Sequence, residues 1–76
     1  MSAIPDIQKG KYYHRKTDHS YEVIDVALQT ETDEWLVIYR PLWNSDIKLF
    51  ARPYTMFVEK VELNGELKPR FEKVDE

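Results

Sequence analysis

Ten aromatic side chains have to be placed in a chain of 76 residues that contains no cysteine. This length is enough for one domain, and such a domain buries only about 60% of the surface that its unfolded chain exposes. Each aromatic ring can bury roughly 150–250 Å², and apolar residues make up 42% of the sequence. The chain therefore has the material for a packed core, and rings have to build that core without help from disulfides.

Turn residues divide the chain into short extended runs. The clearest turn is Asn64-Gly65, because both residues tolerate the positive φ that a type I′ hairpin demands. Adjacent apolar residues at Val23 and Ile24 break the alternation of their strand and indicate a β-bulge. Pro53 favours a single helical turn over residues 52–56. Strands are predicted over residues 11–16, 21–29, 35–42, 47–51 and 57–63, with 66–72 as a short edge segment.

These elements predict an all-β fold, a small five- to six-stranded SH3-like barrel with one short helical turn before the last long strand. A sandwich of seven strands does not fit in the chain. We expect a single SH3-like β-barrel domain over residues 10–73, a flexible lead-in over residues 1–9 and a frayed C-terminus over residues 74–76.

Six short motifs follow one another along the chain. They are Gly10-x-Tyr12-x-His14, Tyr21-Glu22-Val23, Glu31-Thr32-x-Glu34, Val37-x-Tyr39-Arg40-x-Leu42, Arg52-Pro53-x-x-Met56-Phe57-x-Glu59 and Pro69-Arg70-Phe71. In this order they resemble a small, mostly bacterial family of domains of unknown function, numbered 1653. The resemblance covers nearly the whole domain, and it implies an SH3-like barrel with no assigned activity. Phe50 and Trp43 stand where the family often has Trp and Tyr, and both keep an aromatic ring.

Charge and composition limit the partners. The net charge of −3 argues against a general nucleic-acid binder, which is usually basic. No apolar stretch is long enough to cross a membrane, and the N-terminal residues lack the basic and apolar regions of a signal peptide. The absence of cysteine fits a cytosolic protein. We expect a cytoplasmic protein that has no membrane partner.

No set of residues predicts catalysis. A nucleophilic triad needs Ser or Cys beside a His that a carboxylate orients, and no serine of this chain lies in a glycine-rich elbow. The two glycines, Gly10 and Gly65, cannot form a phosphate-binding loop. The residues that could ligate a metal match no zinc spacing; they are His14, His19, Asp18 and Asp33. The sequence predicts no enzyme activity, no cofactor and no metal site.

Five residues are candidates for a binding surface at the barrel rim. The rings exceed what so small a barrel holds, so Trp43 and Tyr54, in or beside predicted turns, are expected to reach the surface. Arg40 and Arg52 can grip a carboxylate or phosphate bidentately, together with His14. The leading hypothesis is a non-catalytic binding module for an unknown protein or peptide. The structural alternative is that the arginines only form ion pairs, with Glu31, Glu34 or Glu59.

Two other functions stay open. A basic strand face would bind RNA or single-stranded nucleic acid through its phosphates, using Lys9, Lys11, Tyr13 and Arg15. Alternatively, a rim pocket formed by Arg40, His14 and Glu31 would take a small anionic ligand or support a reaction. An exposed aromatic patch would also suit a homo-oligomer interface.

Overall fold

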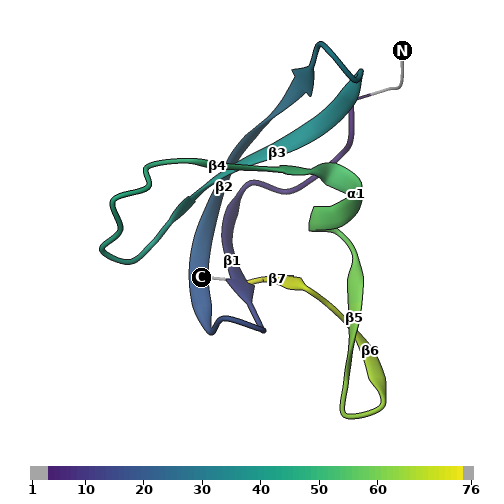
Figure 1. Ribbon diagram of the computed structural model, residues 1–76. Helices are drawn as coiled ribbons and strands as arrows, with labels where there is room; N and C mark the ends of the chain where they lie inside the picture. Colours follow the sequence, from purple (N-terminus) through teal and green to yellow (C-terminus); the bar gives the residue numbers. More distant parts are fainter. Residues whose placement is uncertain (1–3, 75–76) are drawn as a thin grey trace.

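The computed structural model describes residues 4–74, which form seven strands and one helical turn (Figure 1). The elements are β1 (Gly10–His14), β2 (His19–Gln29), β3 (Glu34–Pro41), β4 (Phe50–Pro53), α1 (Tyr54–Phe57), β5 (Lys60–Leu63), β6 (Glu66–Pro69) and β7 (Phe71–Lys73). An antiparallel sheet of five strands has the order β4-β3-β2-β1-β7, and β5 pairs with β6 in a separate hairpin. The predicted all-β class is confirmed, and so is the helical turn.

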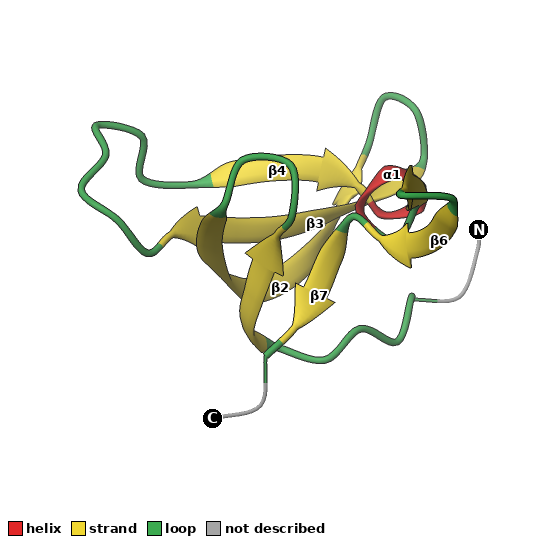
Figure 2. Ribbon diagram, turned by 90° about the horizontal axis from the view of Figure 1, so that it is seen from below, coloured by secondary structure: helices red, strands yellow, loops and turns green. Residues whose placement is uncertain are grey.

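The predicted closed barrel is corrected to an open, curved sheet (Figure 2). Within residues 4–74 no ladder joins its two edge strands, β4 and β7. The reason is that β5, the strand that would have to bridge them, pairs only with β6. The last segment is split at Arg70, whose amide bonds to the carbonyl of Glu59 over 3.0 Å. This split also raises the number of strands from the expected five or six to seven.

Two strands begin three residues later than the sequence predicts, and the other boundaries of β1 to β5 and α1 agree to within two residues. The fourth strand begins at Phe50 rather than Ile47, because the Ile47 amide donates to Ser45 Oγ over 3.1 Å and prolongs the preceding turn. Phe57 was predicted to begin a long strand, but it ends α1, is 1% exposed and points into the core. The strand after the helical turn is therefore short, and starts at Lys60.

Local backbone signals are confirmed. Asn64 and Gly65 have φ values of 52° and 82°, as the predicted hairpin turn requires. Asp18 and Asp33 also have positive φ and lie in the β1–β2 and β2–β3 turns. The β2–β3 register shifts between Val23 and Asp25, which is the predicted bulge.

The core lies on the concave face of the sheet, where α1 covers it. Its buried members are Tyr12, Val23, Val37, Tyr39, Phe57 and Phe71. The aromatic prediction holds in part, since Trp43 and Tyr54 are half-buried. No aromatic ring is among the large exposed apolar side chains of residues 4–74, because the rings pack against one another. Those exposed side chains are Ile4, Ile24, Leu42, Ile47, Leu49, Met56, Val58 and Leu67.

The segments at the two ends of the described part both pack against the sheet. The lead-in, residues 4–9, has no regular structure, but Ile7 packs on the core and the Tyr12 hydroxyl donates to the Gln8 carbonyl over 2.7 Å. At the other end β7 pairs with β1, with Phe71 opposite His14. Val74, predicted to fray, donates its amide to the Lys11 carbonyl over 2.9 Å. Residues 1–3 and 75–76 lie outside the described part. In that part, no helix has the length and apolarity to cross a membrane.

Candidate binding site

The strand register places Arg52 on the concave face of the sheet. Arg52 stands opposite Val37 in the β3–β4 ladder, and Phe50 stands opposite Tyr39. Residues that face each other in a ladder project to the same side of a sheet, and neighbours along a strand project to opposite sides. Arg52 therefore shares the side of buried Val37 and Tyr39, whereas exposed Ala51 projects from the convex face.

Two aromatic side chains hold the Arg52 guanidinium. Its Nε donates to the Tyr39 hydroxyl over 3.2 Å. Its Cζ lies 5.3 Å from the centroid of the Phe71 ring, within range of a cation–π contact. Arg52 is half-buried, and its two terminal amino groups form no hydrogen bond with any residue of the described chain. Those groups are thus oriented but unused.

The other three arginines all have a carboxylate partner. Arg15 pairs with Glu72. Arg40 Nε lies 2.6 Å from Glu22 Oε1, and Arg70 Nη2 lies 2.9 Å from Glu59 Oε1. Arg52 forms no ion pair within residues 4–74, so it is the one arginine of the chain whose charge this part of the structure leaves unmatched.

His14 lies against the same ring as Arg52. The centroids of the His14 and Phe71 rings are 4.5 Å apart, and the two residues face each other in the β1–β7 ladder. His14 is only 6% exposed. Its Nδ1 lies 2.7 Å from Thr17 Oγ1, and its buried Nε2 has no hydrogen-bond partner in the described structure. A buried polar atom without a partner is costly, and a ligand atom could satisfy it.

His14 is buried and has basic side chains around it. Burial lowers the pKa of His14, and the charges of Arg52 and Arg70 lower it further, with smaller effects from Lys16 and His19. The neutral ring is therefore favoured near pH 7. Because Thr17 can accept or donate at Nδ1, the neutral ring can present an N–H at Nε2. An anion beside Arg52 would meet positive charge and the unused guanidinium donors, with the buried Nε2 of His14 behind them against the Phe71 ring.

Trp43 is connected to this position through Tyr21. Trp43 stacks on His19 with ring centroids 4.1 Å apart, and it makes a T-shaped contact with Tyr21 with centroids 5.0 Å apart. Tyr21 in turn contacts Phe71 at 5.7 Å. Tyr54 packs against the core cluster, and after burial it is the second cause of the raised pKa of Tyr12. The structure thus gathers four of the five predicted rim residues around the concave aromatic cluster: His14, Trp43, Arg52 and Tyr54.

Arg40 does not belong to this group. It stands directly opposite Glu22 in the β2–β3 ladder, on the convex face, and pairs with it. Glu31 lies in the turn beyond the far end of β3, about 20 Å from Arg40 at roughly 3.3 Å per strand residue. The predicted pocket of Arg40, His14 and Glu31 is therefore not assembled. The predicted structural ion pairing does occur, but Arg40 uses Glu22, and Glu59 pairs with Arg70.

The predicted nucleic-acid face is mixed in charge. Lys9 Nζ lies 3.9 Å from Asp25, and Arg15 pairs with Glu72. The Tyr13 hydroxyl donates to Asp18; this bond is the first cause, and burial the second, of the raised pKa of Tyr13. Lys11 faces Glu22 in the β1–β2 ladder. Carboxylates therefore lie among the basic groups that would have to follow a phosphate backbone.

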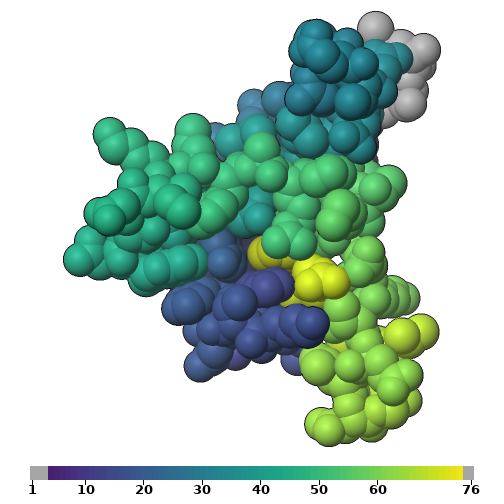
Figure 3. Space-filling view, in the orientation of Figure 1, coloured from purple at the N-terminus to yellow at the C-terminus, as the bar shows by residue number. Residues whose placement is uncertain are grey.

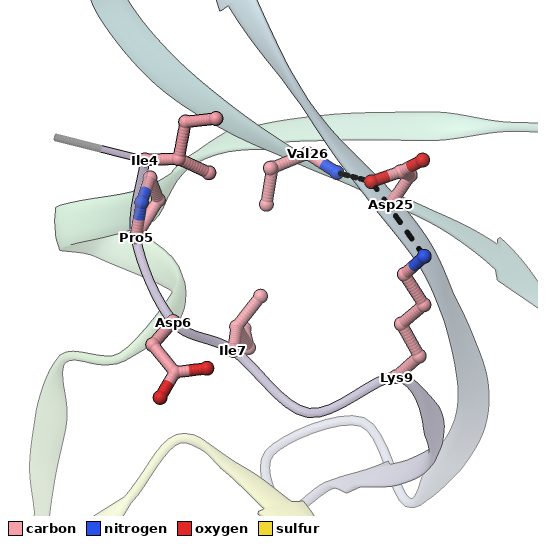
Figure 4. Close-up of a pocket in the computed structure, with 7 residues that line it drawn as sticks. All are labelled: Ile4, Pro5, Asp6, Ile7, Lys9, Asp25 and Val26. Carbon is pink, nitrogen blue, oxygen red and sulfur yellow. Dashed lines mark hydrogen bonds and ion pairs between the residues drawn. The ribbon is translucent and has the colours of Figure 1, made fainter.

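A separate cavity of about 180 Å³ lies between the lead-in and β2 (Figure 4). Its walls are Ile4, Pro5, Asp6, Ile7, Lys9, Asp25 and Val26. Of the residues singled out from the sequence only Lys9 lines it, and the Lys9–Asp25 pair lies on one side. Within residues 4–74, no three His, Asp or Glu side chains are grouped so that they could hold a metal ion.

Sequence reasoning did not identify the two side chains that hold the Arg52 guanidinium, Tyr39 and Phe71. Tyr39 and Phe71 were noted as ring-bearing residues of two motifs, but their role depends on which strands lie side by side. The only sequence signal for the orientation of Arg52 is its spacing of two from Phe50, which puts both side chains on one face of β4.

Comparison with known proteins agrees with the fold and the motifs. No curated protein matches the chain. The structure is similar to the crystal structure of a DUF1653 protein from Bordetella bronchiseptica, with 30% sequence identity and a TM-score of 0.81. That match covers 95% of this chain and 92% of the other. The family model described as a protein of unknown function, DUF1653, matches residues 10–73. The predicted resemblance is confirmed, and the chain belongs to the DUF1653 family.

Proposed function

We propose that this domain is a non-catalytic module that binds a carboxylate of a protein or peptide partner, with Arg52 as the anchor. One observation carries the proposal. Arg52 is fixed by Tyr39 and Phe71, yet within residues 4–74 it alone among the arginines has no carboxylate partner. A guanidinium that is already oriented loses little freedom when it forms two parallel hydrogen bonds to a carboxylate.

His14 supports the same ligand chemistry. Its buried Nε2 lacks a partner in the described chain, and it would become a second donor when the partner opens the contact of His14 with the Phe71 ring, which Arg52 also contacts. The half-buried rings of Trp43 and Tyr54 would supply apolar contact around the charged group. Binding of a carboxylate here would match the unpaired guanidinium charge and satisfy a buried ring nitrogen.

A protein carboxylate fits better than a nucleic-acid backbone. The chain carries a net charge of −3, and the basic face over β1 is interleaved with Asp18, Asp25 and Glu72. Long polyanions need several unmatched cations in a row, whereas one carboxylate needs a single oriented arginine. We expect the module to act in the cytoplasm, a location that suits a cysteine-free chain.

The test compares two arginines with opposite expected behaviour. Proteins are captured from cleared cell lysate, with and without nuclease, on the tagged parent chain and on its Arg52→Gln and Arg40→Gln variants. Arg40 is the matched control, because it is paired with Glu22 on the other face. We expect a protein that the parent and Arg40→Gln retain and that Arg52→Gln loses by about tenfold or more, the value of a charge-assisted hydrogen bond.

Two outcomes contradict the proposal. One is equal retention of every protein by all three chains. The other is retention that nuclease abolishes, which would favour the nucleic-acid face instead. A circular dichroism spectrum of Arg52→Gln that matches the parent is required, because Arg52 also bonds to Tyr39.

A further inference from the structure

We infer that the partner binds as an extended segment along the open edge of β4, adding a strand to the sheet and placing an acidic side chain opposite Arg52. The inference rests on the proposed function and specifies the partner's conformation and sequence pattern. It follows from the edge itself, from the charges along it and from a comparison with the opposite edge of the sheet.

The outer edge of β4 has no strand partner within residues 4–74. β4 pairs with β3 on one side only, and the sheet order ends there. An edge strand leaves the N–H and C=O groups of alternate residues unpaired, and an extended peptide can pair with them. After Pro53 the chain turns away into α1 (Figure 2). In Figure 3 the loop before β4 and the strand itself lie at the surface of the molecule.

Unmatched positive charge marks this edge. Lys48, just before β4, is exposed and, like Arg52, forms no ion pair with the described residues. Ile47 and Leu49, beside Lys48 in sequence, are 51% and 56% exposed. The run into β4 therefore alternates exposed aliphatic and basic side chains. A segment with an alternating acidic and apolar pattern would complement it in both charge and apolarity.

The strand geometry brings the acidic group to Arg52. Directly opposed residues in an antiparallel pair have Cβ atoms about 4.5–5.5 Å apart. A Glu or Asp of the added strand that faces Arg52 would project to the concave side, because Arg52 does. Its carboxylate would then reach the two terminal amino groups that the rest of the described chain leaves unused.

The opposite edge of the sheet lacks these features. β7 has three residues, and the charges on it are engaged: Glu72 pairs with Arg15, and Lys73 Nζ donates to the Val74 carbonyl over 3.2 Å. Lys73 also lies over the Tyr12 ring at 5.9 Å. Of the two edges of the five-stranded sheet, only the β4 edge therefore combines unpaired backbone with unmatched charge within residues 4–74.

The test uses a blocked hexapeptide of alternating glutamate and valine, together with two versions that are N-methylated on either the three glutamate or the three valine amides. An N-methyl group removes a donor and blocks the ladder on one side of a strand. Binding to the ¹⁵N-labelled chain is followed by NMR titration. The same peptide with lysine in place of glutamate is the charge control.

We expect the unmodified peptide to shift the amide signals of β4. One of the two N-methylated peptides, and not both, should bind at least about tenfold more weakly than the unmodified peptide. Equal binding of all three peptides, with loss in Arg52→Gln, would contradict strand addition and leave the carboxylate proposal standing. Binding that is equal in the parent and Arg52→Gln, or absent at millimolar peptide, would contradict the strand inference. If capture also shows no dependence on Arg52, the proposed function fails with it.

Discussion

The ring of Phe57 lies parallel to that of Phe71, with their centroids 4.2 Å apart and 11° between their planes. One ring comes from the helical turn and the other from the last strand, so this pair links α1 to β7. Phe71 also contacts His14, Tyr21 and Tyr39. The same ring therefore supports both the core and the candidate binding site.

Replacing Phe57 is expected to be the most damaging single change in the core. Phe57→Ala should lower the free energy of unfolding by about 3–5 kcal/mol, because it removes a fully buried ring and leaves a cavity against Phe71. Urea denaturation followed by tryptophan fluorescence measures the change. Since small domains have only about 5–15 kcal/mol in total, Phe57→Leu provides a milder variant. Met56→Ala, at a side chain that is 48% exposed, is the control. Equal effects at the two positions would contradict the packing.

The Arg40–Glu22 pair is expected to contribute little to stability. Both side chains are more than 40% exposed, and exposed ion pairs contribute about 0.2–1 kcal/mol. A double-mutant cycle with Arg40→Ala and Glu22→Ala, measured by urea denaturation at low and high salt, should give a coupling energy in that range that shrinks with salt. A coupling above about 2 kcal/mol would mean that the pair is shielded from solvent in a way its exposure does not suggest.

The contribution of the β5–β6 turn to stability is expected to depend on the backbone conformation of Gly65 and not on the space around this residue. Gly65 has φ of 82°, and a Cβ added there would meet no atom within 4 Å. Gly65→Ala should therefore cost roughly 1–2 kcal/mol of stability from the left-handed backbone alone. Gly65→Asn should cost clearly less, because Asn adopts positive φ more readily. The two variants are compared by thermal and urea denaturation, and equal losses would show that the backbone conformation is not the cause.

Stability is expected to fall on mild acidification because of His14. Its pKa in the folded chain lies below the ordinary value of 6.5, first through burial and then through Arg52 and Arg70. Below about pH 6.5 the unfolded chain takes up a proton at this residue that the folded chain resists, so the free energy of unfolding decreases as the pH falls. Above that pH His14 adds no dependence.

Denaturant titrations between about pH 7.5 and pH 5.5 test this effect. The parent should lose stability over that interval, and His14→Gln should lose less. If removal of His14 leaves the slope unchanged, the acid sensitivity comes from another group.

Features of the fold that depend on neighbouring residues could be predicted from the sequence. The Asn64-Gly65 turn follows from the φ preferences of two residues, and the bulge from adjacent apolar side chains at Val23 and Ile24. Closure of the sheet could not be predicted, because the alternation within β5 does not say which strand it pairs with. The position of Phe57 at the end of α1 could not be predicted either. An apolar residue at that position suits either a strand or the end of a single helical turn.

The site was predictable in its residue types and not in its grouping. Arg52 and His14 were named because of their chemistry, and both lie against Phe71. Arg40 was grouped with them, although the register sets it opposite Glu22 on the other face. A slip of one residue exchanges the two faces of a strand, and the bulge after Val23 introduces such a shift nearby. Sequence alone does not fix which side of the bulge each residue belongs to.

The β1–β7 ladder also has a consequence for the timing of folding during synthesis. The first strand of the chain and the last pair with each other, His14 opposite Phe71, so the ring that supports core and site is supplied by one of the last residues of the domain to be translated. On the ribosome the earlier strands can form hairpins, but the domain cannot complete its core until residues 71–73 have emerged. A chain released before that point would lack Phe71 and would expose the aromatic cluster to proteases and chaperones.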